Sequence, residues 1–219
     1  VGSEMCIRDR YEVDRREKIA TVTLNNPTGT DSAPWWSCYQ GVKVIDKWER
    51  DDDVKVVIIK GGGKSWCTGH DLDAYLSSAG VRSESREAAA GKKYRRTNRQ
   101  TLLLMRDEWL FQTRLLYSLK PTIAQVHGMC IEYGNGLQIA CDMTVASEDA
   151  HFGNLGQVIG ISGIVPVTPL SNLIGYKRLR EMMISGRTVS ARQAAAMGMI
   201  NRVVPREKLD AEVKNEARR

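Results

Sequence analysis

Two apolar patterns alternate along this chain. Short extended runs of apolar and β-branched residues predict strands over 18–24, 54–60, 122–127 and 143–146. Segments whose apolar residues recur every three or four positions predict long helices over 32–50 and 101–119. The predicted buried face of the second helix consists of Leu102, Met105, Trp109, Gln112, Leu116 and Leu119. Shorter helices are predicted over 166–174, 176–185, 190–197, where Ser190 is a candidate N-cap, and 206–217.

This order of elements predicts the fold class. Strand–helix units come first and helices come last, which indicates an α/β core followed by a helical C-terminal region. Residues 1–10 fit no later pattern, and we interpret them as a non-native or disordered leader. We expect the core over 11–175 and the start of the helical region over 176–219. The sequence stops inside a charged helical segment, so we expect this region to be incomplete.

Two glycine-containing corners are the strongest functional signal. Residues 128–136 hold three glycines between the extended run 122–126 and the helix-like run 137–141. A similar corner over 61–72 follows the apolar run 56–59. Glycine permits tight turns and close backbone approach, and an N–H group at a helix N-terminus can stabilise an oxyanion. The two corners together predict a pocket in which two N–H groups hold a carbonyl oxygen.

Composition narrows the alternatives. Hydrophobic residues make up 42% of the chain and charged residues 26%, as in an ordinary soluble globular protein. No run approaches the ~18 apolar residues of a membrane helix, so we expect no membrane-spanning helix. The N-terminus lacks an apolar signal core, which argues against secretion. Five cysteines without a C-x-x-C pair indicate buried thiols in a reducing compartment, so we expect a cytoplasmic protein. The three histidines lack metal-ligand spacing, and we predict no structural metal.

The net charge of +6 is concentrated in one segment. Residues 82–106 hold eight Lys or Arg against Glu84 and Glu87. Such a segment can attract the phosphates of a nucleotide-bearing ligand or of nucleic acid. A solvated, mobile surface segment is the simpler interpretation. A nucleic-acid-binding module is the weaker alternative, because only Tyr94 is available nearby for stacking.

Several sequence blocks resemble the motifs of a known enzyme family. Residues 54–72 resemble the first oxyanion-hole segment of the enoyl-CoA hydratase/isomerase (crotonase) family, and 120–142 resemble its second. Further blocks at 146–153, 184–187 and 191–205 follow in the family's order. The resemblance covers about residues 11–210 and implies a crotonase-like spiral of ββα units, usually assembled as trimers or hexamers. It also implies an acyl-CoA substrate, with coenzyme A as part of the substrate and no separate cofactor.

The resemblance assigns site residues by their positions. The oxyanion N–H donors fall on His70 and Tyr133; a one-residue gap would place the second on Gly134 instead. Contacts with the substrate and its CoA moiety fall on Thr28, Gly29, Thr30, Thr68, Gly69, Asp71, Leu72, Gly136, Leu155 and Gly156.

Departures from the family pattern concern the reaction. The two glutamates that activate water in hydratases are replaced by Gly136 and Gly156, and an aspartate used by some isomerases falls near Gly163. Tyr133 stands where the family has a glycine, and it would be strained if that corner requires a positive φ. These departures favour isomerisation or C–C hydrolysis over two-glutamate hydration. A catalytically silent acyl-CoA binder is the rival within the fold.

Several side chains near the corners could carry chemistry. Glu132 is the best candidate for a general base if it faces the pocket, and otherwise it is an exposed or interface glutamate. The side chains of His70 and Tyr133 could approach the acyl group or simply pack. We expect His127 and His151 to be structural, with His151 in the core. Cys67 and Cys130 are predicted to be buried thiols, and Asp71 to cap a helix.

Overall fold

A six-stranded sheet forms the centre of the protein. This computed structural model describes residues 10–25, 37–70, 97–160 and 167–219. Neighbouring strands of the sheet follow the order β1 (Arg10–Asp14), β2 (Ile19–Leu24), β3 (Val56–Gly61), β4 (Thr122–Val126), β6 (Met143–Ser147) and β9 (Arg202–Val204). β1 pairs with β2 antiparallel, and every other pair is parallel. Parallel pairs require crossover connections, so helices are expected to cover the sheet faces.

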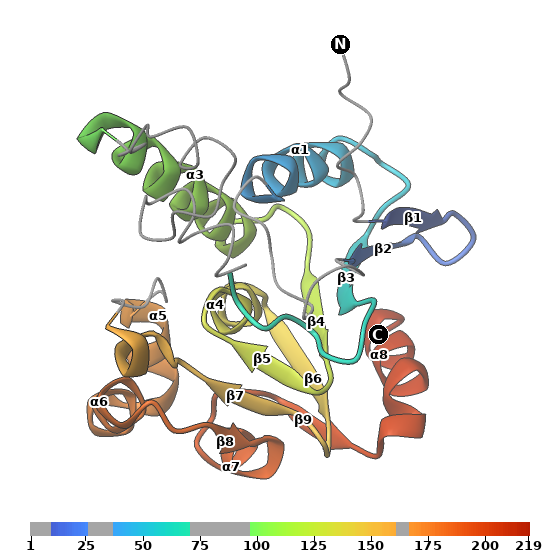
Figure 1. Cartoon of the computed structure of the whole chain (residues 1–219). Coiled ribbons are helices and arrows are strands. Elements are labelled where there is room, and N and C mark those ends of the chain that lie inside the picture. The colour runs from blue at the N-terminus through green and yellow to red at the C-terminus, as the bar shows by residue number, and fades with distance from the viewer. Residues whose placement is uncertain (1–9, 26–36, 71–96, 161–166) are drawn as a thin grey trace.

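Alternation along the strands divides the core between the two faces. Val57 and Ile59 of β3 pack in the larger cluster, with α1 (Ser37–Glu49), α3 (Asn98–Leu116) and α4 (Tyr133–Ala140). Ile58 between them packs in a second cluster beneath α8 (Leu209–Ala217), which contacts β3, β4 and β6. Figure 1 shows α1 and α3 together above the sheet and α8 at its side.

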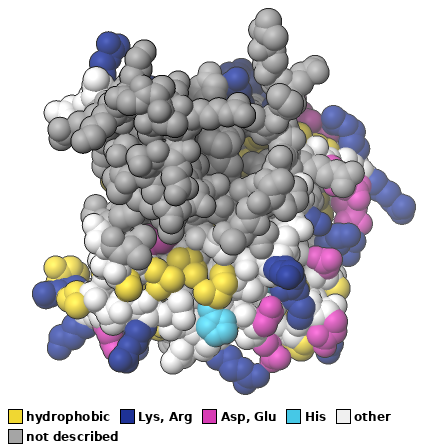
Figure 2. Space-filling view, in the orientation of Figure 1, with side chains coloured by type: hydrophobic (Ala, Val, Ile, Leu, Met, Phe, Trp, Pro, Cys, Tyr) yellow, Lys and Arg dark blue, Asp and Glu magenta, His cyan; other side chains and the backbone are white. Residues whose placement is uncertain are grey.

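A small second sheet joins the corner to the C-terminal part. β5 (Met129–Ile131) pairs parallel with β7 (His151–Gly153), which pairs antiparallel with β8 (Val189–Ser190). Around it lie η1 (Gly156–Ile159), α5 (Val167–Ile174), α6 (Tyr176–Ser185) and α7 (Ala191–Ala196), and η2 (Arg206–Lys208) precedes α8. Figure 2 shows a band of apolar side chains that extends from α5 and α6 at the lower left toward β7, with Lys and Arg near its left end. No helix in the described part of the chain has the length and apolar character needed to span a bilayer.

Most predicted elements are confirmed, and the differences have local causes. The predicted strands correspond to β2, β3, β4 and β6, and the short C-terminal helices to α5, α6, α7 and η2–α8. Ser190 caps α7 as predicted, in a capping box with Gln193. Periodicity did not predict β5, β7, β8 and β9, because runs of two or three residues are too short to show alternation. It also did not predict β1, in which Tyr11 and Val13 alternate with polar residues over only five positions beside the predicted leader. β1 begins at Arg10, the last residue of the predicted leader.

The predicted buried face of α3 is wrong at most of its described positions. Leu102, Trp109 and Leu119 are 67%, 61% and 80% exposed, and Leu116 is also exposed. Of the predicted face, Gln112 is buried, and it lies beside buried Phe111 and Leu115. The sequence of this helix is apolar on several sides, so periodicity alone does not select the buried face. Contact with α1 and α4 selects Phe111 and Leu115 instead.

Candidate active site

The two glycine corners lie side by side. Backbone hydrogen bonds join segment 66–67 to segment 127–131: Trp66 N donates to His127 O at 2.8 Å, Cys67 N to Met129 O at 3.1 Å, and Ile131 N to Cys67 O at 2.9 Å. Cys67 and Cys130 form an isolated parallel bridge. This pairing delivers the chain after Cys67 and the chain after Ile131 to the same place.

Gly134 allows the two corners to approach closely. A Cβ atom on Gly134 would lie 2.5 Å from Cys67 O and 2.7 Å from Cys67 Cβ. Contacts under 3 Å are not tolerated between a side chain and backbone, so only glycine fits without movement. In the alternative register, Gly134 and not Tyr133 would be the second N–H donor. The contact with Cys67 requires a glycine at position 134 in either register.

The structure brings His70 and Tyr133 together. Their ring centroids are 4.7 Å apart, and the Tyr133 ring is buried, with the Phe111 ring 6.4 Å away. Tyr133 is the first residue of α4, where a helix has N–H groups that its own carbonyls do not reach. The two predicted donor positions are thus neighbours at a helix N-terminus. Their role as an oxyanion hole stays a prediction.

Glu132 has an unusual backbone conformation. Its φ of 51° and ψ of −115° lie in a region that favours glycine, so the strain expected at Tyr133 falls one residue earlier. Glu132 N donates to Gly153 O at 2.9 Å, and Glu132 O accepts from Gly136 N at 2.9 Å. Gly69, at φ 91°, lies against it, because a Cβ there would be 3.0 Å from Glu132 Cβ.

The Glu132 carboxylate is turned inward. Its Oε1 accepts a hydrogen bond from Gly156 N. Burial raises the pKa of Glu132 above its usual value, while the N–H groups of Gly156 and Leu155 and the nearby His70 partly lower it. Of the two interpretations of Glu132, the structure therefore favours the inward carboxylate. A half-buried carboxylate with a raised pKa suits a general base.

The remaining predicted site residues divide into two groups. Gly69, Gly136 and Gly156 are buried beside Glu132 or α4, and Thr68 and Leu155 are half-buried. Thr28, Gly29, Thr30, Asp71 and Leu72 lie outside the described residues, as does most of the basic segment 82–106. Among the described residues, no group of three or more His, Cys, Asp or Glu side chains could hold a metal ion.

Predictions for the other candidate side chains are mostly confirmed. His127 is buried, and its Nε2 lies 3.0 Å from Gly63 O, a structural role. Cys67 and Cys130 are buried and form no disulfide in the described part of the chain, and burial raises the pKa of Cys130 well above its usual value. The core placement of His151 is wrong. His151 is exposed on β7, because its neighbour Phe152 faces the core and successive strand residues face opposite sides.

Sequence reasoning missed a buried polar network beneath the corner. Asn135 Nδ2 donates to Asn154 Oδ1 at 3.0 Å, and Gln138 Nε2 donates to Asn135 Oδ1 at 3.1 Å. Thr144 Oγ1 donates to Gln138 Oε1 at 2.8 Å. All four residues are at most 3% exposed. Isolated amides in a sequence carry no signal of such a network, because the partners come from separate elements.

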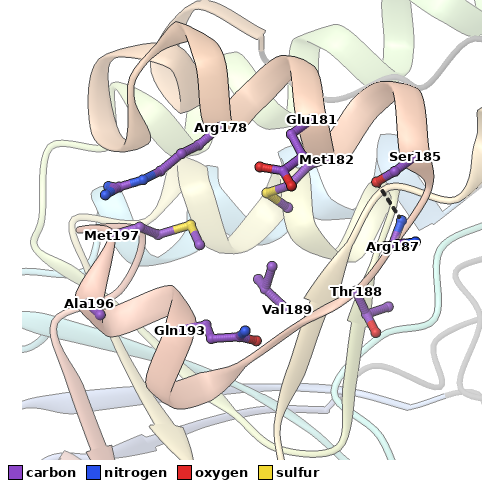
Figure 3. Close-up of a pocket in the computed structure, with 10 residues that line it drawn as sticks. All are labelled: Arg178, Glu181, Met182, Ser185, Arg187, Thr188, Val189, Gln193, Ala196 and Met197. Carbon is purple, nitrogen blue, oxygen red and sulfur yellow. Dashed lines mark hydrogen bonds between the residues drawn. The ribbon is translucent and has the colours of Figure 1, made fainter.

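A pocket of about 390 Å³ lies elsewhere, between α6, β8 and α7. Figure 3 shows Met182 and Val189 pointing into it, with Arg178 extending along one side. No described residue of either corner lines it. The glycine corners, and not this pocket, therefore hold the residues that sequence analysis singled out.

Comparison with known proteins identifies the family. The sequence profile of the enoyl-CoA hydratase/isomerase family matches residues 14–219. The chain belongs to the enoyl-CoA hydratase/isomerase family. The crystal structure of a family member from Xanthobacter autotrophicus Py2 is 32% identical with a TM-score of 0.80, covering 96% of this chain and 72% of that one. The crotonase-like α/β fold with C-terminal helices is thereby confirmed.

Curated relatives in the family differ in their reactions. A hydroxycinnamoyl-CoA hydratase-lyase from Pseudomonas fluorescens is 27% identical over 89% of this chain and 66% of its own length. A peroxisomal Delta(3,5)-Delta(2,4)-dienoyl-CoA isomerase from Arabidopsis thaliana is 30% identical over 74% of this chain and 56% of its own length. The chain thus spans between about half and two thirds of these relatives. Family membership by itself therefore does not identify the reaction.

Proposed function

We propose that this protein processes an acyl-CoA thioester through an enolate. In this proposal the backbone N–H groups of His70 and Tyr133 hold the thioester oxygen, and the Glu132 carboxylate removes a proton from the α-carbon. The electron pair of that C–H bond moves into the enolate, whose negative charge lies on the oxygen between the two donors. The observation that carries the proposal is the inward Glu132 carboxylate beside both donor positions.

The chemistry explains why these parts belong together. An α-proton of a thioester is only weakly acidic, so its removal requires stabilisation of the oxyanion at the moment it forms. A base whose pKa is raised toward neutral pH accepts the proton more readily than an ordinary carboxylate. Burial supplies this shift at Glu132. The same glutamic acid can return the proton at another carbon, which is the requirement for isomerisation.

The reaction is proposed to be isomerisation or C–C hydrolysis. Two-glutamate hydration is disfavoured because Gly136 and Gly156 have no side chain at the corresponding positions. One relative is named as a dienoyl-CoA isomerase, so isomerisation occurs among similar proteins. A silent acyl-CoA binder remains the rival within the fold.

Binding of the ligand is assigned to residues around the corners. We propose that Thr68, Gly69 and Leu155 contact the thioester end, since they flank Glu132 and His70. CoA enters as part of the substrate, with no separate cofactor. We also propose that the protein assembles as a homotrimer or hexamer in the cytoplasm. The support for this assembly is the family resemblance and the exposed apolar residues of α3, and light scattering after size exclusion tests it.

Deuterium exchange at the α-carbon tests the enolate step without knowledge of the final product. The protein would be incubated in D₂O with butyryl-, 3-butenoyl- and phenylacetyl-CoA, and deuterium uptake would be measured by mass spectrometry. We expect exchange by the unchanged protein and a fall of about 100-fold or more for Glu132→Gln, as general-base catalysis contributes about 10²–10⁴-fold. Glu148→Gln, which alters an exposed carboxylate paired with Arg192, is the matched control.

Two results would contradict the proposal in different ways. CoA ester binding without exchange or turnover would favour the silent binder. Full exchange by Glu132→Gln would show that another group is the base.

A further inference from the structure

The Glu132 main chain and side chain are both attached to one short turn. Its N–H donates to Gly153 O at 2.9 Å, and its Oε1 accepts from Gly156 N. Residues 153–156 therefore hold the carboxylate relative to its own backbone. Asn154 lies inside this turn, with a completely buried side chain.

Asn154 connects the turn to the helix that Glu132 precedes. Its Oδ1 accepts from Asn135 Nδ2 at 3.0 Å, and Asn135 is in the first turn of α4. Asn154 Nδ2 lies 3.1 Å from Met183 Sδ of α6. A side-chain hydrogen bond thus joins the turn that binds the carboxylate to the first turn of the helix that presents the proposed oxyanion position.

The rest of the network fixes the direction of that bond. Asn135 Oδ1 is occupied by Gln138 Nε2, and Gln138 Oε1 is occupied by Thr144 Oγ1. Rotation of the Asn135 amide by half a turn would place two N–H₂ groups against each other and two oxygens against each other. Each amide therefore has one orientation, which holds Asn135 Nδ2 toward Asn154.

Stability alone is a weak reason for such a network. Buried neutral hydrogen bonds contribute about 0.5–1.5 kcal/mol each, and apolar groups of the same shape can stabilise a core equally well. Unlike hydrogen bonds, however, apolar contacts do not fix the relative orientation of the groups that they join. We propose that Asn154 and Asn135 are positioning residues that hold the Glu132 carboxylate against the turn, at a fixed place relative to the N-terminus of α4. This inference rests on Glu132 being the base.

A double-mutant cycle on α-carbon exchange tests the positioning role. The variants are Asn154→Leu, Glu132→Gln and the pair, and Asn154→Ala replaces Asn154→Leu if the latter fails to fold. We expect Asn154→Leu to lower the exchange rate constant at saturating CoA ester about 10- to 100-fold, because small displacements of a reacting group have effects of that size. The KM for the ester should change less than about 2-fold, since Asn154 is not assigned to ligand binding. In the Glu132→Gln background the same change should have little further effect, because residues that act as a unit are not additive.

Ser147→Ala is the matched control. It removes a buried hydroxyl whose bond to Val126 O is 3.4 Å, and Ser147 lies outside the network. It should leave exchange unchanged, and melting temperatures of all variants separate loss of fold from loss of position.

Three outcomes would overturn the inference. If Asn154→Leu lowers exchange equally with and without Glu132, its role is structural. If it leaves exchange unchanged while Glu132→Gln abolishes exchange, the base stands and the positioning role fails. If Glu132→Gln retains full exchange, the proposed function fails and the positioning role fails with it.

Discussion

Glu132 combines a strained backbone with a useful side chain. Its φ of 51° and ψ of −115° are disfavoured for any residue with a Cβ, and such conformations cost about 1–3 kcal/mol. Its carboxylate meanwhile binds Gly156 N within the candidate site. Strain at the proposed base is consistent with a functional role, because the rest of the fold must hold Glu132 in a backbone conformation that it disfavours.

Two substitutions at Glu132 separate backbone strain from the carboxylate. Both Glu132→Gly and Glu132→Ala remove the hydrogen bond to Gly156, but only glycine relieves the strain. We expect Glu132→Gly to be roughly 1 kcal/mol more stable than Glu132→Ala by urea unfolding. At an ordinary position alanine is the more stable by 0.5–1 kcal/mol. The order alanine above glycine would therefore refute a positive φ at this residue.

The raised pKa of Glu132 predicts a pH-dependent stability. The folded state binds the Glu132 proton more tightly than the unfolded state, so this group lowers stability as pH rises above its usual value of 4.5. Glu132→Gln removes the effect. We expect the variant to gain stability over the unchanged protein between that pH and neutrality, and the gain to vanish below it. Chemical unfolding at pH 4, 5.5 and 7 measures the difference, and a gain that grows toward low pH would contradict burial as the dominant cause.

The rate of α-carbon exchange should rise with pH, whereas the contribution of Glu132 to stability falls. The base acts in its ionised form, so the rate of α-carbon exchange should rise through a midpoint above 4.5. A rate profile in D₂O buffers, corrected for the isotope effect on pH readings, locates the midpoint. A midpoint at or below the usual value would indicate that Glu132 is more hydrated than its burial implies.

At the scale of elements, the site depends on how closely two segments approach. The N-terminus of α4 can lie beside segment 67–70 only because Gly134 has no side chain. Periodicity predicted both strands leading to the corners, since alternation is a local property of the sequence. The distance between the corners is not local, because it follows from the pairing of β5 with β7 and from the bridge between Cys67 and Cys130.

Gly134→Ala tests this close approach. The added methyl group would displace α4 from Cys67 O, so we expect α-carbon exchange to fall about 10-fold or more and stability to fall by about 1–3 kcal/mol. Gly160→Ala is the control, because Gly160 has a positive φ of 75° but no atom within 4 Å of an added Cβ. It should lower stability without lowering exchange. Equal exchange by both variants would show that the corners tolerate separation.

For the whole molecule, α8 covers the sheet face opposite the site. Leu209, Val213 and Ala217 pack on Ile58 and Ile123 in the second core cluster. These contacts join α8 to the central strands, and no described residue of the corners belongs to the cluster. The contacts of α8 therefore stabilise the sheet from the face opposite the proposed site.

Leu209→Ala tests this separation. Truncation of a buried leucine typically costs 2–5 kcal/mol, so we expect a large fall in melting temperature with little change in exchange per folded molecule. Lys214→Ala, on the exposed side of α8, should change stability by less than about 0.5 kcal/mol. A selective loss of exchange in Leu209→Ala at temperatures where it is folded would show that the two faces are coupled.

The sequence by itself determined the α/β class, most strands of the central sheet, most helices, and the two glycine corners. It could do so because alternation, helical periodicity and glycine at turns are properties of neighbouring residues. Only the tertiary structure decided which face of α3 is buried, that His151 is exposed, and that strain falls on Glu132. It also decided that the Glu132 carboxylate meets the turn at Gly156 and that Asn135 meets Asn154. These features depend on packing between segments about twenty residues or more apart, and no local pattern records such contacts.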